Sequence, residues 1–142
     1  MPVYLLDSDT VTGAFRRHPQ ISHRIATTPP ELIWISSIAV EESVGRQINR
    51  INSIHSRKEQ GLTSACVLLV KLMAHLQKFQ ILPYSDKAEA LYRTWTPQQK
   101  RVGTNDCRIA ASALVAGFTV VTCNSKDFSR LPDVGYEDWS LG

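Results

Sequence analysis

The sequence predicts an α/β fold, with a mainly parallel central sheet of four to five strands flanked by helices. Short apolar runs at residues 3–6 (VYLL), 32–35 (LIWI) and 118–122 (FTVVT) are typical of strands buried on both faces of a sheet. Stretches with helical spacing of apolar residues separate these runs, and this alternation indicates a parallel sheet. The 142 residues show no internal repeat, so we expect one domain spanning residues 1–142.

Capping residues and breakers mark the ends of the expected helices. Residues 7–10 (DSDT) follow the first strand and offer N-caps, and Ser36 does the same after the second strand. Gly117 has the usual place of a glycine at a helix C-terminus. Helices are expected at residues 8–17, 20–26, 38–52, 62–79, 86–95 and 103–116, with a loop or a frayed helix end at the polar residues 53–60. Further strands are expected at residues 80–83 and 136–139, and a turn at residues 127–128.

The expected helix at residues 62–79 carries a strong apolar stripe. The stripe consists of Leu62, Cys66, Leu69, Met73 and Leu76, widened by Ala65 and Leu72. Such a stripe faces either the core or an oligomer or partner surface. With the nearby Trp34, this helix is also a candidate contact surface.

The three cysteines, Cys66, Cys107 and Cys123, are widely spaced in apolar stretches. We expect each to be a reduced cysteine in the core. The absence of CxxC or Cys/His spacing argues against a zinc site.

Charge and hydropathy limit the class of protein. The formal net charge of +3 permits a polyanionic partner without requiring one, but the basic clusters flank the acidic motifs. No apolar run approaches the roughly 20 residues of a spanning helix. The N-terminal segment lacks the basic start of a signal peptide. We therefore expect a cytoplasmic protein that does not contact a membrane.

Acidic residues follow the predicted strands or begin the helices after them. Asp7 follows the first strand, Asp127 follows the run at 118–122, and Asp106 and the pair Glu41–Glu42 lie near helix N-termini. Ligand sites in open α/β sheets form outside the carboxyl ends of the strands. Alone, each acid has a simple explanation as a cap or a solvent-facing side chain. Together, converging carboxylates require a cation, and oxygen ligands suit Mg²⁺ or Mn²⁺. Such ions promote in-line displacement at phosphorus, the chemistry of many nucleases.

At these residues the chain resembles PIN-domain proteins, specifically VapC-type toxin ribonucleases of type II toxin-antitoxin systems. The resembling segments are residues 4–11 (YLLDSDTV), 35–46 (ISSIAVEESVGR), 103–114 (GTNDCRIAASAL) and 118–139 (FTVVTCNSKDFSRLPDVGYEDW). The last two are specific together. An Asn-Asp pair opens an Ala-rich helix, and a strand, a T-x-N-x-x-D-F motif and a tail ending in Asp-Trp follow.

The resemblance implies a PIN-like domain that hydrolyses phosphodiester bonds of RNA with Mg²⁺ or Mn²⁺, leaving a 3′-hydroxyl and a 5′-phosphate. Carried over by motif, Asp7 and Asp106 would hold the metal, and Glu42 and Asp127 would complete the catalytic set. Glu42 follows from the V-E-E segment, whereas counting back from the following glycine selects Glu41 instead.

Further roles are implied around this set. Asn124 stands where many PIN domains carry aspartate, and it would hold a water or a substrate phosphate. Arg46 and Arg108, with Arg16, would neutralise flanking phosphates of the substrate, or would instead pair with the site carboxylates. The resemblance also implies a VapB-like antitoxin partner and a homodimer.

Two other functions are compatible with parts of the sequence. Residues 7–11 (DSDTV) after a strand fit the nucleophile motif of haloacid-dehalogenase-like phosphatases, and Ser36 or Ser37 fits their next motif. That alternative lacks the late acidic pair and leaves Asp106 unexplained. The second alternative is a non-catalytic PIN fold that only binds RNA or an antitoxin.

Overall fold

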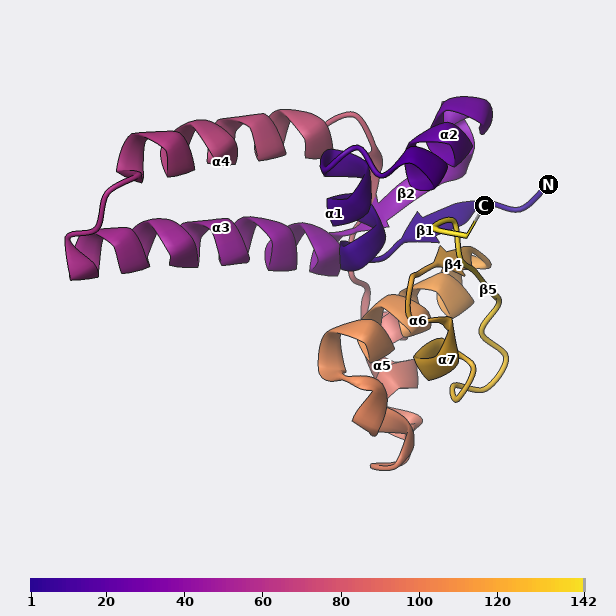
Figure 1. Ribbon diagram of the computed structural model, residues 1–142. Coiled ribbons are helices and arrows are strands. Elements are labelled where there is room, and N and C mark those ends of the chain that lie inside the picture. Colours follow the sequence, from indigo (N-terminus) through magenta and orange to yellow (C-terminus); the bar gives the residue numbers. More distant parts are fainter. Residues whose placement is uncertain (142) are drawn as a thin grey trace.

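A five-stranded parallel sheet forms the centre of the protein (Figure 1). The structure is a computed structural model that describes residues 1–141. It confirms the predicted α/β class, with every neighbouring pair of strands parallel and the strands in the order β3-β2-β1-β4-β5. The strands are β1 (Tyr4–Leu6), β2 (Ile33–Ser36), β3 (Gln80–Leu82), β4 (Thr119–Val121) and β5 (Tyr136–Glu137).

The register of β1 determines where the polar residues gather. Leu6 pairs with Ile35 of β2 on one side and with Val121 of β4 on the other. All strands point the same way, so the residues that follow these three positions leave the sheet at one edge. Asp7 and Thr122 are therefore neighbours although 115 positions separate them in the sequence. The backbone N–H of Asp7 donates to the carbonyl of Val121 at 3.0 Å.

Helices cover both faces of the sheet, close to the positions that the sequence predicts. Side-chain caps begin several of them: Asp7 caps the first helix, Ser36 the third and Ser85 the fifth. Gly117 ends the sixth helix in the left-handed conformation. The helices are α1 (Ser8–Phe15), α2 (Pro19–Thr27), α3 (Ser37–Arg57), α4 (Leu62–Leu76), α5 (Asp86–Thr94), α6 (Thr104–Ala116) and α7 (Ser125–Phe128), with short 3-10 helices at Pro30–Leu32 and Gln99–Val102.

Two apolar cores lie on opposite faces of the sheet. Successive side chains of a strand point to opposite faces. Leu5 and Val120 therefore pack against α5, α6 and the start of α3, whereas Leu6 and Val121 pack against α1, α2 and the end of α4. Trp34 is partly buried and its ring lies 5.8 Å from that of Phe118. The sheet is thus packed between two helical layers.

The helices α3 and α4 lie side by side and project from the sheet as an arm (Figure 1). The predicted loop or frayed helix end at residues 53–60 begins later than expected, because α3 continues to Arg57 and ends at Lys58 in the left-handed conformation. Only residues 58–60 of that stretch are outside the helix. The reason is tertiary: Ile54 is buried inside the arm, and this packing supports a helical end that is otherwise polar.

The apolar stripe of α4 is narrower than predicted. Ala65, Leu72 and Leu76 are buried, but Cys66 and Met73 are exposed. Several further apolar side chains of this helix face solvent, with Val70 67% exposed. None of the helices in residues 1–141 combines the length and the hydropathy that a membrane span requires.

The cysteine expectation is correct only in part. All three cysteines are free, and Cys107 is buried as predicted. Cys66 and Cys123 are exposed, so neither is a core residue. Cys66 lies on the outer face of α4, and Cys123 follows β4 as the chain leaves the sheet.

Replacing Gly117 with alanine should lower the free energy of unfolding by about 1–2 kcal/mol, because φ at this position is +76° and a Cβ is strained there. The matched control is Gly45→Ala within α3, where a new Cβ meets nothing within 4 Å. That change should raise the free energy of unfolding by about 0.5–1 kcal/mol. Urea unfolding measures both changes. If both variants changed the free energy of unfolding in the same direction, the left-handed conformation assigned to Gly117 would be contradicted.

Candidate active site

Asp7 is a buried carboxylate at the carboxyl edge of the sheet. Its side chain is 1% exposed and its Oδ1 accepts the backbone N–H of Thr10 at 2.9 Å, as the N-cap of α1. Burial raises the pKa of Asp7, while hydrogen bonds from Thr122 and Thr10 act to lower it. The group is therefore costly to bury as an anion, and the positive end of α1 offsets part of that cost.

Asp106 lies in the first turn of α6, and the other acids act on it. Its pKa is raised to about 7, mainly by burial and in addition by the neighbouring negative charges. Those charges belong to four carboxylates, in decreasing order of effect Asp7, Glu42, Asp9 and Asp127. The structure thus brings together five acids, one from the turn between β1 and α1 and one each from α1, α3, α6 and α7.

Glu42 is the glutamate of α3 that acts on Asp106. The hydroxyl of Ser8 donates to its Oε1 at 2.6 Å, and Nη2 of Arg46 lies 4.0 Å from its Oε2. Glu41 is exposed, and it is not among the charges that act on Asp106. Ser8 is a site residue that the sequence did not single out, because its partner lies 34 residues away and no local pattern connects them.

Asn124 and Asp127 come from the segment after β4 and lie near these acids. The amide Nδ2 of Asn124 donates to Oδ2 of Asp9 at 3.1 Å, and its backbone N–H donates to the hydroxyl of Thr122 at 2.9 Å. Asp127 is partly buried on the single turn of α7. An amide at position 124 adds no charge, and its hydrogen bond holds one of the acids in place.

Arg108 lies outside this group. Its Nε is 3.3 Å from Oε1 of Glu89, and its guanidinium stacks over the ring of Tyr92 at 4.9 Å. The hydroxyl of Tyr84 donates to the same carboxylate oxygen at 2.6 Å. Substrate binding by Arg108 stays a prediction, and it would require this side chain to leave its ion pair.

The arrangement of acids suits a hard divalent cation. The donors are carboxylate oxygens, and the charge that they impose on one another is what a bound cation would compensate. Within the described residues, no three His, Cys, Asp or Glu side chains are grouped to enclose an ion.

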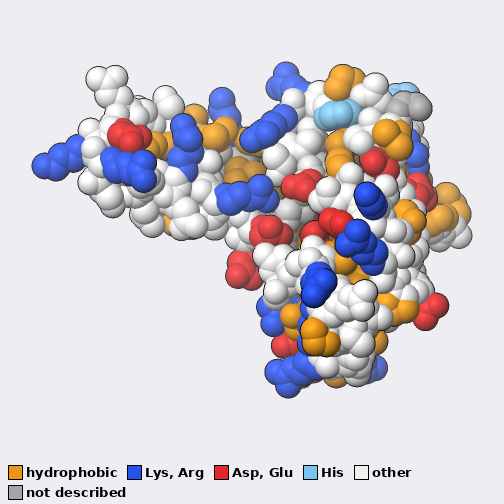
Figure 2. Space-filling model, turned by 60° about the horizontal axis from the view of Figure 1, so that its bottom comes forward, with side chains coloured by type: hydrophobic (Ala, Val, Ile, Leu, Met, Phe, Trp, Pro, Cys, Tyr) orange, Lys and Arg blue, Asp and Glu red, His pale blue; other side chains and the backbone are white. Residues whose placement is uncertain are grey.

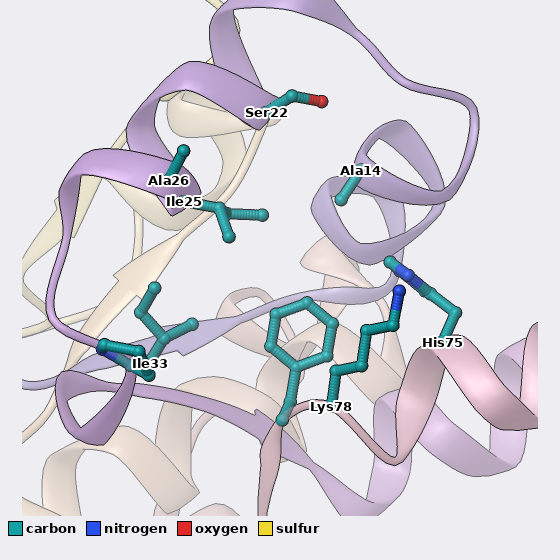
Figure 3. Close-up of a pocket in the computed structure, with 9 residues that line it drawn as sticks. Ala14, Ser22, Ile25, Ala26, Ile33, His75 and Lys78 are labelled. Atoms are coloured by element: carbon teal, nitrogen blue, oxygen red, sulfur yellow. The ribbon is translucent and has the colours of Figure 1, made fainter.

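A separate cavity of about 360 Å³ lies between α1, α2 and the end of α4 (Figure 3). Its wall is mainly apolar, with Ile25 and Ile33 on one side and His75 and Lys78 on the other. Burial lowers the pKa of His75, whose Nε2 donates to the carbonyl of Val11 at 3.3 Å. None of the lining residues is acidic, so this cavity is distinct from the carboxylate site.

A known protein family matches most of this chain. The family described as the PIN domain matches residues 4–134. The chain belongs to the PIN-domain family. Among curated relatives of this PIN domain, Ribonuclease VapC2 from Rickettsia felis is 28% identical over 141 residues, covering 96% of this chain and 98% of that protein. Ribonuclease VapC1 from Haemophilus influenzae is 26% identical over 141 residues, covering 97% and 98%.

Solved structures share the fold. DNA-bound VapBC from Salmonella typhimurium matches this PIN domain with a TM-score of 0.76 at 24% identity, covering 98% of this chain and 99% of that one. VapBC2 from Rickettsia felis, bound to a DNA fragment from its promoter, matches with a TM-score of 0.71 at 24% identity, covering 96% and 98%.

The raised pKa of Asp106 predicts a pH-dependent stability. Its value is about 7 in the folded protein, against 3.8 for an ordinary aspartate, so ionisation destabilises the metal-free fold above pH 7 and the penalty disappears toward pH 4. Asp106→Asn should therefore be more stable than the parent at pH 8, by roughly 2–4 kcal/mol in EDTA. Urea unfolding at pH 8 and pH 4.5 measures this.

The control for this prediction is Asp86→Asn, which removes an exposed aspartate from the first turn of α5. Its effect should change little between the two pH values. If Asp106→Asn raised the free energy of unfolding equally at both pH values, ionisation of Asp106 would not be what destabilises the parent fold.

Proposed function

We propose that this PIN domain is a metal-dependent endoribonuclease and the toxin of a VapBC-type toxin-antitoxin pair. The observation that carries the proposal is the set of carboxylates around Asp106, whose mutual repulsion calls for a cation at the carboxyl edge of the sheet. The ribonuclease names of the curated relatives, which cover nearly the whole chain, support the same reaction.

Asp7 and Asp106 are the proposed metal ligands, and Mg²⁺ is the proposed ion, with Mn²⁺ as the alternative. When bound, the ion supplies a Lewis acid that lowers the pKa of water and stabilises charge on a phosphate. Asp7 is suited to this role because its buried carboxylate is held by Thr10, so little reorganisation accompanies binding. Asp106 comes from a different element, the first turn of α6.

Glu42 and Asp127 would complete the catalytic set. Ser8 orients the carboxylate of Glu42, which can accept a proton from the attacking water or position it. Asp127 acts on Asp106 from α7 and adds negative charge where Asn124 does not. Arg46 is close to Glu42 and exposed, so it can bind a phosphate of the RNA at the rim of the site.

The proposed partner is a VapB-like antitoxin, and the proposed assembly contains a homodimer. The related solved structures are described as VapBC complexes from Salmonella typhimurium and Rickettsia felis. Exposed apolar side chains of α4, including Val67 and Val70, offer a surface for such contacts.

RNA cleavage in Mg²⁺ tests the function. Asp7→Asn and Asp106→Asn should each lower the rate by about 100-fold or more, because each removes a charged ligand from a site that needs a cation. EDTA should abolish cleavage by the parent. The matched control, Asp86→Asn, should cleave at the parental rate, because that aspartate begins α5 away from the other acids. Parental rates for both site variants would disprove the carboxylate mechanism.

A second pair of variants separates the two glutamates of α3. Glu42→Gln should slow cleavage by about 10-fold or more, whereas Glu41→Gln should leave the rate unchanged, because only Glu42 acts on Asp106 and accepts the Ser8 hydroxyl. The reverse order would assign the role to Glu41. Circular dichroism confirms that each variant is folded.

A further inference from the structure

A basic cavity lies at the base of the arm, beside the carboxylates. It has a volume of about 480 Å³ and lies between α1, α3 and α4. Arg46 is part of its wall and lies 4.0 Å from the carboxylate of Glu42, so the cavity adjoins the candidate active site. The lining residues are Thr12, Phe15, Arg16, Ser43, Arg46, Gln47, Arg50, Leu68 and Leu72.

Ser43 contributes a buried hydroxyl that lacks a partner. Its residue is 7% exposed, and its Oγ is the one buried side-chain polar atom in residues 1–141 without a hydrogen bond. Buried polar atoms in folded proteins nearly always have a partner. Because Ser43 also belongs to the cavity wall, rotation about its Cα–Cβ bond can turn this hydroxyl toward an oxygen of a ligand.

The charge of the cavity selects an anion. Three arginines line it, Arg16, Arg46 and Arg50, and all three are exposed. None of the lining residues is acidic. Within the described part of the chain, Arg16 and Arg50 form no ion pair, and Arg46 has only the 4.0 Å contact with Glu42. Guanidinium groups without a carboxylate partner match the geometry of phosphate oxygens.

The basic surface continues outward along α3. A second hollow of about 460 Å³ shares Arg46 and Arg50 with the first and reaches Arg57 at the end of the helix. Its lining includes one acid, Glu59, which lies 3.9 Å from Arg57. At 1.5 Å per residue, the distance along the helix axis from Glu42 to Arg57 is about 22 Å. Figure 2 shows Lys and Arg side chains along the arm and acidic side chains gathered where the arm meets the body.

We propose that this surface binds the backbone of the RNA strand that leads away from the scissile bond, with a flanking phosphate in the basic cavity. Ser43 donates its free hydroxyl to that phosphate, and Arg16 and Arg50 neutralise it. Phe15 and Leu72 supply an apolar wall for a sugar or a base. The inference rests on the proposed function, and it assigns to the arm the task of holding the strand while the carboxylates act on it.

Binding of a dye-labelled oligouridylate in EDTA tests this without cleavage. Fluorescence anisotropy across a salt series gives the affinity and the slope of log K against log salt. For the double variant Arg16→Gln/Arg50→Gln we expect about a 10-fold loss of affinity and a slope that is smaller by about 0.7, because the two arginines neutralise one phosphate and each neutralised phosphate of a single strand contributes about that much. The charge-matched control is Lys71→Gln/Lys78→Gln. It replaces an exposed lysine of α4 and an exposed lysine just after that helix, both outside the two hollows, and it should keep the parental slope.

Ser43→Ala gives an independent readout. Removing an unpartnered buried hydroxyl should leave the melting temperature unchanged or raise it, whereas the affinity for oligouridylate should fall. A variant with parental affinity would show that the hydroxyl does not contact the strand. A lower melting temperature together with parental affinity would give Ser43 a structural role only.

The remaining outcomes decide against the proposal. An arginine double variant with the parental slope, or a lysine control with the same loss, would show that RNA does not use this cavity. If the arginine double variant kept the parental affinity for oligouridylate but bound polyglutamate more weakly than the parent does, the surface would be assigned to an acidic protein instead. Because binding is measured in EDTA, these results are independent of whether Asp7→Asn and Asp106→Asn abolish cleavage, so failure of the inference and failure of the proposed function are distinguishable.

Discussion

Electrostatic repulsion among carboxylates at one edge of the sheet is the constraint around which this protein is built. Asp106 shows it most clearly, because its pKa is raised to about 7 by burial and by four neighbouring acids. A fold gains no stability from such an arrangement without a cation. The unfavourable energy of the site must therefore be offset elsewhere, and the two apolar cores that pack on the two faces of the sheet offset it.

The central position of β1 makes the arrangement possible. Its neighbours β2 and β4 pair with it in the same register, so three chain segments leave the sheet together. Asp7 is then held by α1, which it caps, and by Thr122, which follows β4. Asp7 is buried, and hydrogen bonds fix its carboxylate. A preorganised metal ligand should be held in this way.

The helix α3 carries groups of both signs on one surface. Glu42, Arg46 and Arg50 are four residues apart, so they share one face of the helix. The acid lies near the N-terminal end, where Ser8 holds it, and the arginines extend along the arm. The length of α3 therefore matters for function as well as for packing, because its last turns carry the basic surface away from the carboxylates.

The sequence alone determined the alternation of strands and helices, the residues that cap or end them, and the acids Asp7 and Asp106 as candidate ligands. These features depend on local patterns, namely apolar runs, helical periodicity and residues next to breakers. Local patterns failed where distant packing decides: the polar end of α3 is helical because Ile54 is buried against the arm, and Cys66 turned out to lie on the exposed face of α4.

Only the tertiary structure decided which acids meet. It turned Glu42 toward Asp106 and left Glu41 in solvent, and it joined Ser8 to Glu42 and Asn124 to Asp9 across 34 and 115 residues of chain. It also left the hydroxyl of Ser43 buried without a partner among arginines. The physical reason is that hydrogen bonds and charge interactions act over a few ångströms in space, and positions far apart in the sequence become neighbours only when the parallel sheet is assembled.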